Sequence, residues 1–197
     1  MKEKKVIDYT RTYRRIEADK KKCILYIVIL LLLGFLLMWT QIDDLTRMIC
    51  KICTGVLKKK TGGLLCLIDC DKFKSINDNY GHSVGDKVII AVAEKLRKTC
   101  RDSDVVLRLG GDEFAMFVPG MLEQSVAEKF FERFFENIRQ IDIVEMQGKN
   151  VEISLGACFY DGYEEVSFDQ LYRKADRAMY QSKKQKGCSA VIYGEEM

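Results

Sequence analysis

The sequence has few of the residues that build zinc sites. It contains eight cysteines but a single histidine, His82, and one Cys-x-x-Cys pair, from Cys50 to Cys53. A structural zinc ion takes four Cys or His ligands, usually from two such pairs, so the missing second pair argues against a zinc or redox motif. Cys66 and Cys70 lie in or at the end of an apolar run, which indicates burial rather than a disulfide framework. We therefore interpret the cysteines as free thiols in a reducing compartment.

Internal repeats and low-complexity linkers are absent, and proline occurs once. Pro119 follows an apolar run and is expected to end a strand. A chain of 197 residues has room for one ordinary domain and little more. We recognise no sensor domain before Asp44, so the sequence names no input signal.

Excess positive charge is absent from most of the chain. Residues 1–22 hold nine Lys and Arg against four Asp and Glu, a net charge of +5, whereas the whole chain carries +3, so the other 175 residues carry −2. A face that binds nucleic acid needs clustered basic residues. We therefore expect no nucleic-acid partner, and we interpret residues 1–22 as the solvated basic tail of a membrane anchor.

Charged residues are also absent from Cys23 to Trp39, a run of 17 residues that continues to Ile42 with only Thr40 and Gln41 as polar members. This stretch of 20 is close to the minimum that crosses a bilayer core. No small-x-small site follows Trp39, which argues against a cleaved signal peptide. The pattern predicts a transmembrane helix over residues 23–42, with Trp39 at the interface and a catalytic domain over residues 43–197.

Hydrophobic periodicity predicts an α/β domain with a central, mostly antiparallel sheet flanked by helices. Apolar runs and alternation predict strands over residues 64–68, 104–109, 114–118, 151–159 and 190–193. Helical spacing and a capping box formed by Ser167 and Gln170 predict helices over residues 83–100, 126–138 and 167–184. The strict alternation in residues 151–159 predicts a strand with one buried face. The order of these elements is that of a ferredoxin-like fold.

Two acidic clusters follow apolar runs. One extends from Asp69 to Asp86, and the other, Arg108 to Phe114, contains Gly110 and Gly111, which suit a tight hairpin turn. Strand pairing would place the end of the first strand beside this hairpin. Carboxylates at the ends of buried strands, beside glycines, hold hard cations against phosphate oxygens. The pattern therefore predicts phosphoryl or nucleotidyl transfer.

These clusters, and the ending from Ala175 to Lys183, resemble GGDEF-type diguanylate cyclases, which condense two GTP into cyclic di-GMP. The resemblance starts at Asp44-Leu45-Thr46, which is similar to the family's "DxLTGL", and reaches about Tyr193. It implies the family's ferredoxin-like nucleotide-cyclase fold and a homodimer in which each domain binds one GTP. It also implies two Mg²⁺ or Mn²⁺ ions per active site.

The resemblance assigns roles to individual residues. The metal ligands would be Asp69, the Cys70 carbonyl, Asp112 and Glu113, and the catalytic residues Asp112, Glu113 and Lys74. The substrate would be bound by Phe73, Lys74, Asn77, His82, Asp86, Gly110, Gly111 and Lys183. A loop after Asp71 would offer main-chain N–H groups to phosphates. Asn77 and Asp86 would read guanine, because a carboxylate accepts from the two N–H donors that adenine lacks as a pair.

Arg101 and Asp104 form an RxxD pattern ahead of Gly110. In the family this pattern binds the product and inhibits the enzyme. Arginine forks onto phosphate or stacks on guanine, and aspartate pairs with a guanine edge. A helix-terminal salt-bridge cluster would use the same residues, so a product site and a structural cluster both stay open.

Three departures from the family's pattern concern turnover rather than fold. Arg47 replaces a glycine and Cys50 an asparagine, and the span from Asp44 to the first strand is short for a first helix. At the other end, Lys186-Gly187-Cys188 stands where the family has a glycine followed by a basic residue. A catalytically weak module that binds cyclic di-GMP is therefore the alternative function, and the intact GGDEF motif favours the enzyme. A cyclase of altered base choice is disfavoured by Asp86.

Two arguments about membrane topology oppose each other. The basic tail favours an inside N-terminus, and a single span would then place the domain outside. GTP and reduced thiols occur inside the cell, so we expect a single-pass membrane protein with a cytoplasmic catalytic domain. This expectation requires an outside tail, an anchor that enters and leaves the same leaflet, or further sequence upstream.

Overall fold

The computed structural model describes residues 62–163 and 166–194. Its five strands form one mixed sheet in the order β2-β3-β1-β4-β5. The strands are β1 (Gly63–Cys70), β2 (Val105–Gly110), β3 (Glu113–Pro119), β4 (Ile153–Tyr160) and β5 (Ser189–Ile192). The helices are α2 (Phe73–Tyr80), α3 (His82–Thr99), α4 (Gln124–Arg139), a short 3₁₀ turn η1 (Val144–Met146) and α5 (Phe168–Ser182).

The sheet is mostly antiparallel, as predicted. Strand β1 pairs antiparallel with β3 and with β4, and β2 pairs antiparallel with β3. Only β4 and β5 run parallel, and helix α5 connects them. The lone proline, Pro119, is the last residue of β3, as expected.

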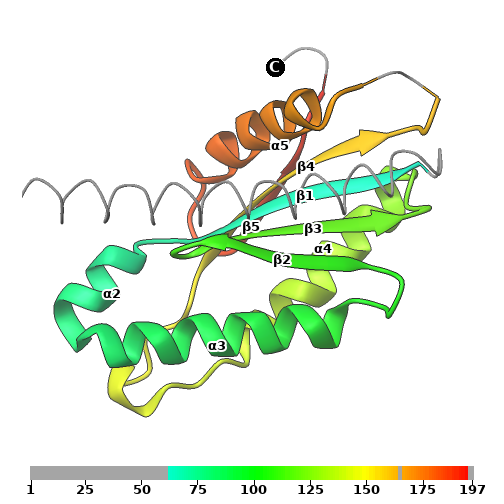
Figure 1. Ribbon diagram of the computed structural model, residues 1–197. Coiled ribbons are helices and arrows are strands. Elements are labelled where there is room, and N and C mark those ends of the chain that lie inside the picture. Colours follow the sequence, from blue (N-terminus) through cyan, green and yellow to red (C-terminus); the bar gives the residue numbers. More distant parts are fainter. Residues whose placement is uncertain (1–61, 164–165, 195–197) are drawn as a thin grey trace, which may run out of the picture. The chain divides into compact units, whose positions relative to one another are not determined.

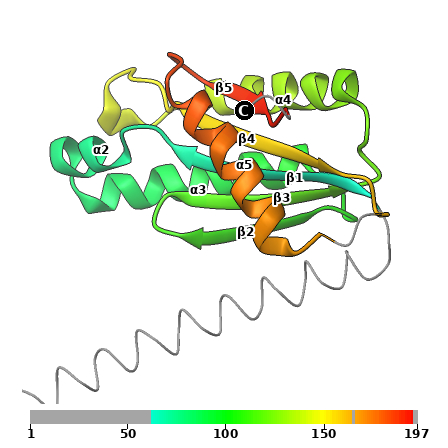
Figure 2. The same cartoon turned by 90° about the horizontal axis from the view of Figure 1, so that it is seen from above.

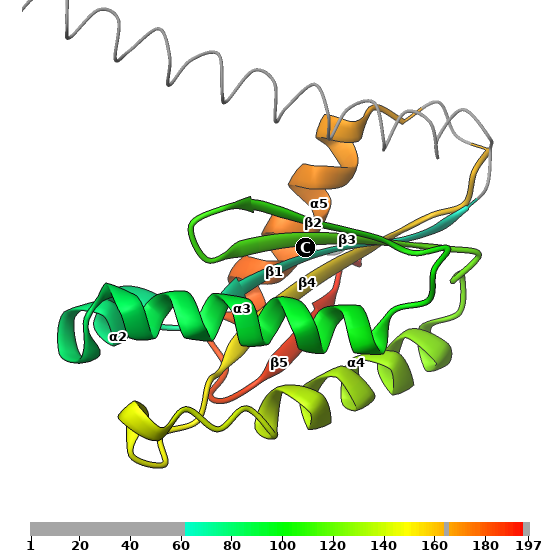
Figure 3. The ribbon, with the colours of Figure 1, turned by 60° about the horizontal axis from the view of Figure 1, so that its bottom comes forward.

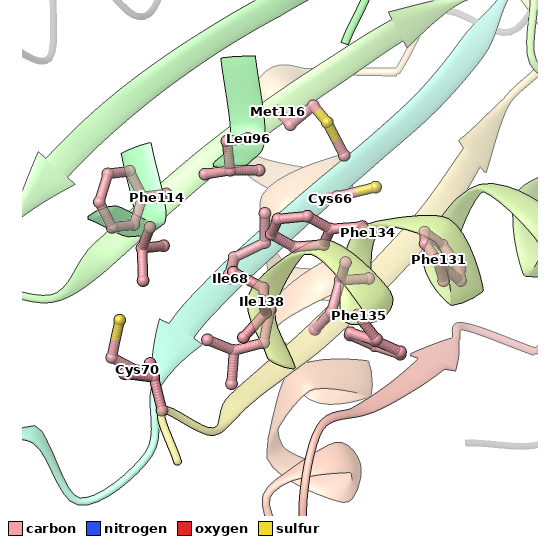
Figure 4. Packing of buried hydrophobic residues seen from close by; sticks show 14 of the residues in the cluster. Cys66, Ile68, Cys70, Leu96, Phe114, Met116, Phe131, Phe134, Phe135 and Ile138 are labelled. Carbon is pink, nitrogen blue, oxygen red and sulfur yellow. The ribbon is translucent and has the colours of Figure 1, made fainter. Parts of the chain in front are cut away.

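Helices cover both faces of the sheet (Figures 1 and 2). Helices α3 and α4 lie against one face, and α5 lies against the other; Figure 3 shows α3 and α4 side by side. The larger core lies between the sheet and α3/α4. Figure 4 shows Phe134 and Ile138 of α4 packed over Cys66 and Ile68 of β1. Burial of these apolar side chains supplies most of the folding free energy.

Two sequence predictions about elements were wrong. The segment after Asp71 is helix α2 rather than a loop, so Phe73 and Lys74 open a helix. Strand β4 is buried on nearly its whole length, not on one face only, and Val151 precedes it. Its alternation misled because β4 is an interior strand with α5 on one face and α3/α4 on the other, so even its small side chains are covered.

Helix α5 packs unusually close to β4 because of Gly156. A β-carbon at this position would meet the Met179 backbone nitrogen at 2.1 Å and the Ala175 carbonyl oxygen at 2.2 Å. Helix α5 begins with the predicted capping box: Ser167 Oγ accepts from Gln170 N–H, and the Gln170 side chain accepts from Ser167 N–H. The position of its C-terminal end is therefore set by direct contact with the sheet.

The five cysteines in the described part of the chain are free thiols, as predicted. Burial raises the pKa of the Cys70 and Cys158 thiols to about 12 in each case. They behave as small apolar groups of the core. The Cys50–Cys53 pair lies outside the described residues.

Among residues 62–163 and 166–194, no helix has the length and apolar character to cross a membrane. The predicted anchor at 23–42, the basic tail at 1–22 and the altered residues Arg47 and Cys50 all lie outside the described part of the chain. The transmembrane helix therefore stays a prediction.

Candidate active site

The ends of β1 and β3 bring the two acidic clusters together, as the sequence predicts. Asp69 lies opposite Glu113 in the antiparallel register, and the Cys70 N–H donates to the Asp112 carbonyl at 3.3 Å. Three carboxylates from two distant segments therefore share one edge of the sheet.

The hairpin between β2 and β3 turns through Gly110 and Gly111. Gly111 has a φ of 52°, in the left-handed region that favours glycine. The Arg108 guanidinium closes the turn, since its Nε and Nη2 donate to the Gly111 carbonyl at 3.0 and 2.7 Å. Around both glycines a β-carbon would meet nothing within 4 Å, so the turn presents an open backbone surface.

A lysine enters this acidic edge from α5. The Lys183 ammonium lies 2.8 Å from Asp69 Oδ2, and the Asp69 side chain is only 12% exposed. Lys183 follows the last residue of α5, as predicted. An ammonium already paired with Asp69 shows that this edge attracts cations.

The carboxylates perturb one another. Partial burial, followed by the charge of Asp69, raises the pKa of Asp112 above its ordinary value of 3.8 and that of Glu113 above 4.5. Burial alone would lower the pKa of Lys183, but its hydrogen bond to Asp69 and the nearby carboxylates raise it. A site with excess negative charge at neutral pH is suited to a multivalent cation.

The chemistry of the donors fits a divalent metal that a nucleotide helps to hold. Asp69, Asp112 and Glu113 offer the hard oxygen ligands that Mg²⁺ and Mn²⁺ prefer. Among the described residues, no three His, Cys, Asp or Glu side chains converge closely enough to hold a metal by themselves. Mg²⁺ is often bound by one or two carboxylates and substrate phosphates, so this spacing is compatible with a metal–nucleotide site. Cys70 points its thiol into the core, which leaves only its backbone for the predicted carbonyl ligand (Figure 4).

A tight turn connects the acidic edge to helix α2. Ser154 Oγ donates to Asp71 Oδ1 at 2.8 Å, and the Asp71 N–H donates to the Glu152 carbonyl at 2.9 Å. Lys72 adopts a left-handed φ of 56°. The turn places Phe73 and Lys74 in the first turn of α2, where unpaired N–H groups of the helix attract anions.

The predicted guanine-reading residues lie where α2 meets α3. A β-carbon on Gly85 would lie 2.0 Å from Asn77 Oδ1, so the carboxamide of Asn77 rests against α3 beside Asp86. Asp86 is exposed on the first turns of α3. His82, the first residue of α3, is exposed as well. The fold thus brings Asn77 and the Asp86 backbone together.

Arg101 and Asp104 lie at the far end of α3, on a turn before β2. The Arg101 N–H donates to Asp104 Oδ2 at 2.7 Å, and the Asp104 N–H donates to the Arg101 carbonyl at 3.0 Å. Both residues line an open groove of about 610 Å³, together with Arg97 and Arg108. Arg108 belongs to the hairpin of the acidic edge, so this groove and the acidic edge share one strand.

Sequence reasoning missed Ser154, Ser182 and Ser189, which are buried hydroxyls that hold the turns around the site. Serine is among the commonest residues of loops and helix ends, so only an alignment of relatives could have singled out these three. Asp71 was noticed only as part of its cluster.

The sheet is ferredoxin-like, carboxylates lie at adjacent strand ends, and the N-terminus of α2 is suited to bind phosphate. These features are typical of α/β domains of the nucleotidyl-transfer class. The family model "Diguanylate cyclase, GGDEF domain" matches residues 50–188, which is more than half of the chain. The chain therefore belongs to the GGDEF-domain family of diguanylate cyclases, as its motifs predicted.

Curated relatives and solved structures are consistent with this family assignment. The chain is 36% identical over 119 residues to the diguanylate cyclase DgcM of Escherichia coli (strain K12), which covers 60% of this chain and 28% of DgcM. It is 37% identical over 128 residues to diguanylate cyclase A of Treponema denticola, covering 64% and 33%. The GGDEF domain of DgcB from Caulobacter crescentus, solved in complex with c-di-GMP, superposes with a TM-score of 0.64 at 25% identity over 75% of this chain and 87% of that one. The chain thus spans a third or less of these two curated relatives.

Proposed function

We propose that the protein condenses two GTP into cyclic di-GMP and two pyrophosphates. The observation that carries the proposal is the convergence of Asp69, Glu113 and Lys183 at one edge of the sheet, beside the hairpin and the start of α2. DgcM and diguanylate cyclase A, named for this activity, are similar to this chain.

The residues at this edge have separate roles in binding the metal ions, the phosphates and the nucleotide. Asp69, Asp112, Glu113 and the Cys70 carbonyl would hold one or two divalent cations, which supply charge neutralisation and acidify the attacking 3′-hydroxyl. Lys74 and the N–H groups of the first turn of α2 bind phosphate oxygens. Lys183, whose ammonium pairs with Asp69, would bind a further phosphate oxygen at this edge. Gly110 and Gly111 leave room for the nucleotide to lie against the hairpin backbone.

The base is read at the junction of α2 and α3. Asp86 accepts from guanine N1–H and N2–H₂, and Asn77 pairs with a ring acceptor. Phe73 and His82 border this junction. A single domain binds one GTP, so two copies must face each other for reciprocal attack, and the active species is a homodimer.

The direct test is turnover of the purified chain with GTP and Mg²⁺, followed by chromatography of the product. Cyclic di-GMP formation supports the cyclase. Binding of cyclic di-GMP without turnover would instead support the alternative, a signalling module that binds through Arg101 and Asp104.

Product inhibition provides a separate prediction. The groove of Arg101 and Asp104 is lined by two further arginines, Arg97 and Arg108, which suits a dianionic guanine nucleotide. Arg101→Ala should raise the product concentration for half-inhibition at least about tenfold, because a charge-assisted hydrogen bond is lost, and should leave the initial rate unchanged. Initial rates with added cyclic di-GMP measure this, and Arg177→Ala on α5 serves as a matched control. If wild-type protein shows no product binding by calorimetry, the RxxD residues are structural.

We also propose that the domain faces the cytoplasm from a single-pass anchor at residues 23–42, because its substrate is there. A fluorescent protein fused after Met197 should be bright, and alkaline phosphatase at the same position should be inactive. An active phosphatase would contradict both the topology and access to GTP.

A further inference from the structure

The position of Lys183 depends on the end of α5. Its ammonium reaches Asp69 from a backbone position just beyond Ser182, and its N–H donates to the Met179 carbonyl at 2.9 Å. The lysine side chain is flexible and loses rotamer freedom when it is held in one geometry. A fixed helix end lowers the entropy cost of the contact with Asp69, because the backbone then already places the lysine near the carboxylate.

Two buried serines fix this helix end. Ser182 Oγ lies 2.9 Å from the Ser189 carbonyl and 2.6 Å from Ser189 Oγ, and it accepts from the Leu155 N–H at 3.3 Å. Ser189 Oγ in turn lies 3.0 Å from the Ser182 carbonyl. One side chain thus connects the last residue of α5 to both β4 and β5.

Both hydroxyl protons of this network have acceptors within the network. Each serine hydroxyl donates once and accepts through two lone pairs. When the Ser189 hydroxyl donates to the Ser182 carbonyl, the single proton of Ser182 Oγ lies between the carbonyl and hydroxyl oxygens of Ser189. The Leu155 N–H fills a lone pair of Ser182 Oγ. In the described part of the chain, no buried side-chain nitrogen or oxygen is left without a partner. Both hydroxyls are needed for this balance.

The network also connects to the strand that borders Asp69. Leu155 follows Ser154, and Ser154 lies opposite Asp69 in β1 and opposite Ser189 in β5. Ser182 is fully buried and Ser189 is 7% exposed, so water cannot replace either hydroxyl without repacking. Strand β4 therefore contacts both partners of the ion pair: it pairs with β1 at Asp69, and it binds Ser182, the residue before Lys183.

We propose that Ser182 and Ser189 are positioning residues that hold Lys183 at the acidic edge and so set the affinity for the phosphates of GTP. This inference rests on the proposed function, in which Lys183 binds a phosphate. If the two serines served stability alone, replacing them by alanine would lower the melting temperature and leave the affinity for GTP unchanged.

The kinetic test uses the whole chain and a double-mutant cycle. Ser182→Ala should raise KM for GTP about tenfold with little change in kcat, because a displaced lysine weakens phosphate binding. In a Lys183→Met background, Ser182→Ala should raise KM no further. An equal rise in both backgrounds, or no rise in either, would overturn the proposal.

The matched control is Thr99→Val. Thr99 carries a buried hydroxyl at the C-terminal end of α3, away from His82 and Asp86. This hydroxyl donates to the Lys95 carbonyl and accepts from the Asn137 side chain. Thr99→Val removes side-chain hydrogen bonds comparable to those lost in Ser182→Ala, and it should leave KM for GTP unchanged. Ser189→Ala is the second test variant, since it keeps the hydrogen bond from the Leu155 N–H to Ser182 Oγ. It should shift KM for GTP in the same direction as Ser182→Ala.

A measurement without turnover separates this inference from the proposed function. Reductive methylation with formaldehyde, read by peptide mass spectrometry, reports how freely the Lys183 amine reacts. Ser182→Ala should increase the rate at Lys183 several-fold and leave Lys149 unchanged. A wild-type chain that makes no cyclic di-GMP would contradict the proposed function. The methylation rates test the positioning role separately: equal rates at Lys183 in wild type and in Ser182→Ala would reject it.

Discussion

Replacement of Asp112 by alanine should abolish cyclic di-GMP synthesis, with a loss of about 10³-fold or more in kcat, because the proposed metal–phosphate centre would lose one of its carboxylates. The fold should survive. The contact of Asp112 with β1 is made by its carbonyl, which accepts from the Cys70 N–H, and that backbone bond is kept in the variant. Radiolabelled GTP turnover measures the activity, and wild-type-like turnover would remove Asp112 from the metal site.

Thermal stability of the same variant adds a second readout. Burial and the neighbouring Asp69 raise the pKa of Asp112 above 3.8, so the folded chain binds its proton more tightly than the unfolded chain. The free energy of unfolding therefore falls as pH rises from the ordinary carboxyl pKa through the raised one. In EDTA at pH 7, Asp112→Ala should melt no lower than wild type. A lower melting temperature at pH 7 would show that the side chain is structural.

Replacement of Asp86 by alanine should raise KM for GTP about 30-fold and weaken discrimination against ATP, because the two hydrogen bonds proposed between Asp86 and the guanine edge would be lost. The side chain is exposed on α3, so its removal should not disturb the core. Initial rates with GTP and competition by ATP measure the effect. Asp78→Ala, at an exposed carboxylate of neighbouring α2, is the control and should behave as wild type. Unchanged selectivity in Asp86→Ala would exclude Asp86 from the guanine site.

Local pattern predicted most elements. The apolar run before Asp69 identified β1, the glycine pair identified the β2–β3 hairpin, and the capping box at Ser167 set the start of α5. These features succeed because strand burial, left-handed turns and helix caps depend on residues near one another in sequence. Helix α2 was missed because it has only eight residues and buries none of their side chains fully, so its pattern is too short to identify a helix without its tertiary contacts.

The sequence by itself determined the family, the order of helices and strands along the chain and the identity of the acidic residues, because motifs and periodicity are local features of a sequence. Only the tertiary structure decided that Lys183 pairs with Asp69, that Ser154 holds Asp71, and that Ser182 and Ser189 tie α5 to two strands. Ser182 and Ser189 are near in sequence but face each other only because the chain turns back between them. The other two pairs join residues 83 or more positions apart. Such contacts follow from the register of β4 against β1 and from the close approach of α5 at Gly156, and no local periodicity encodes either.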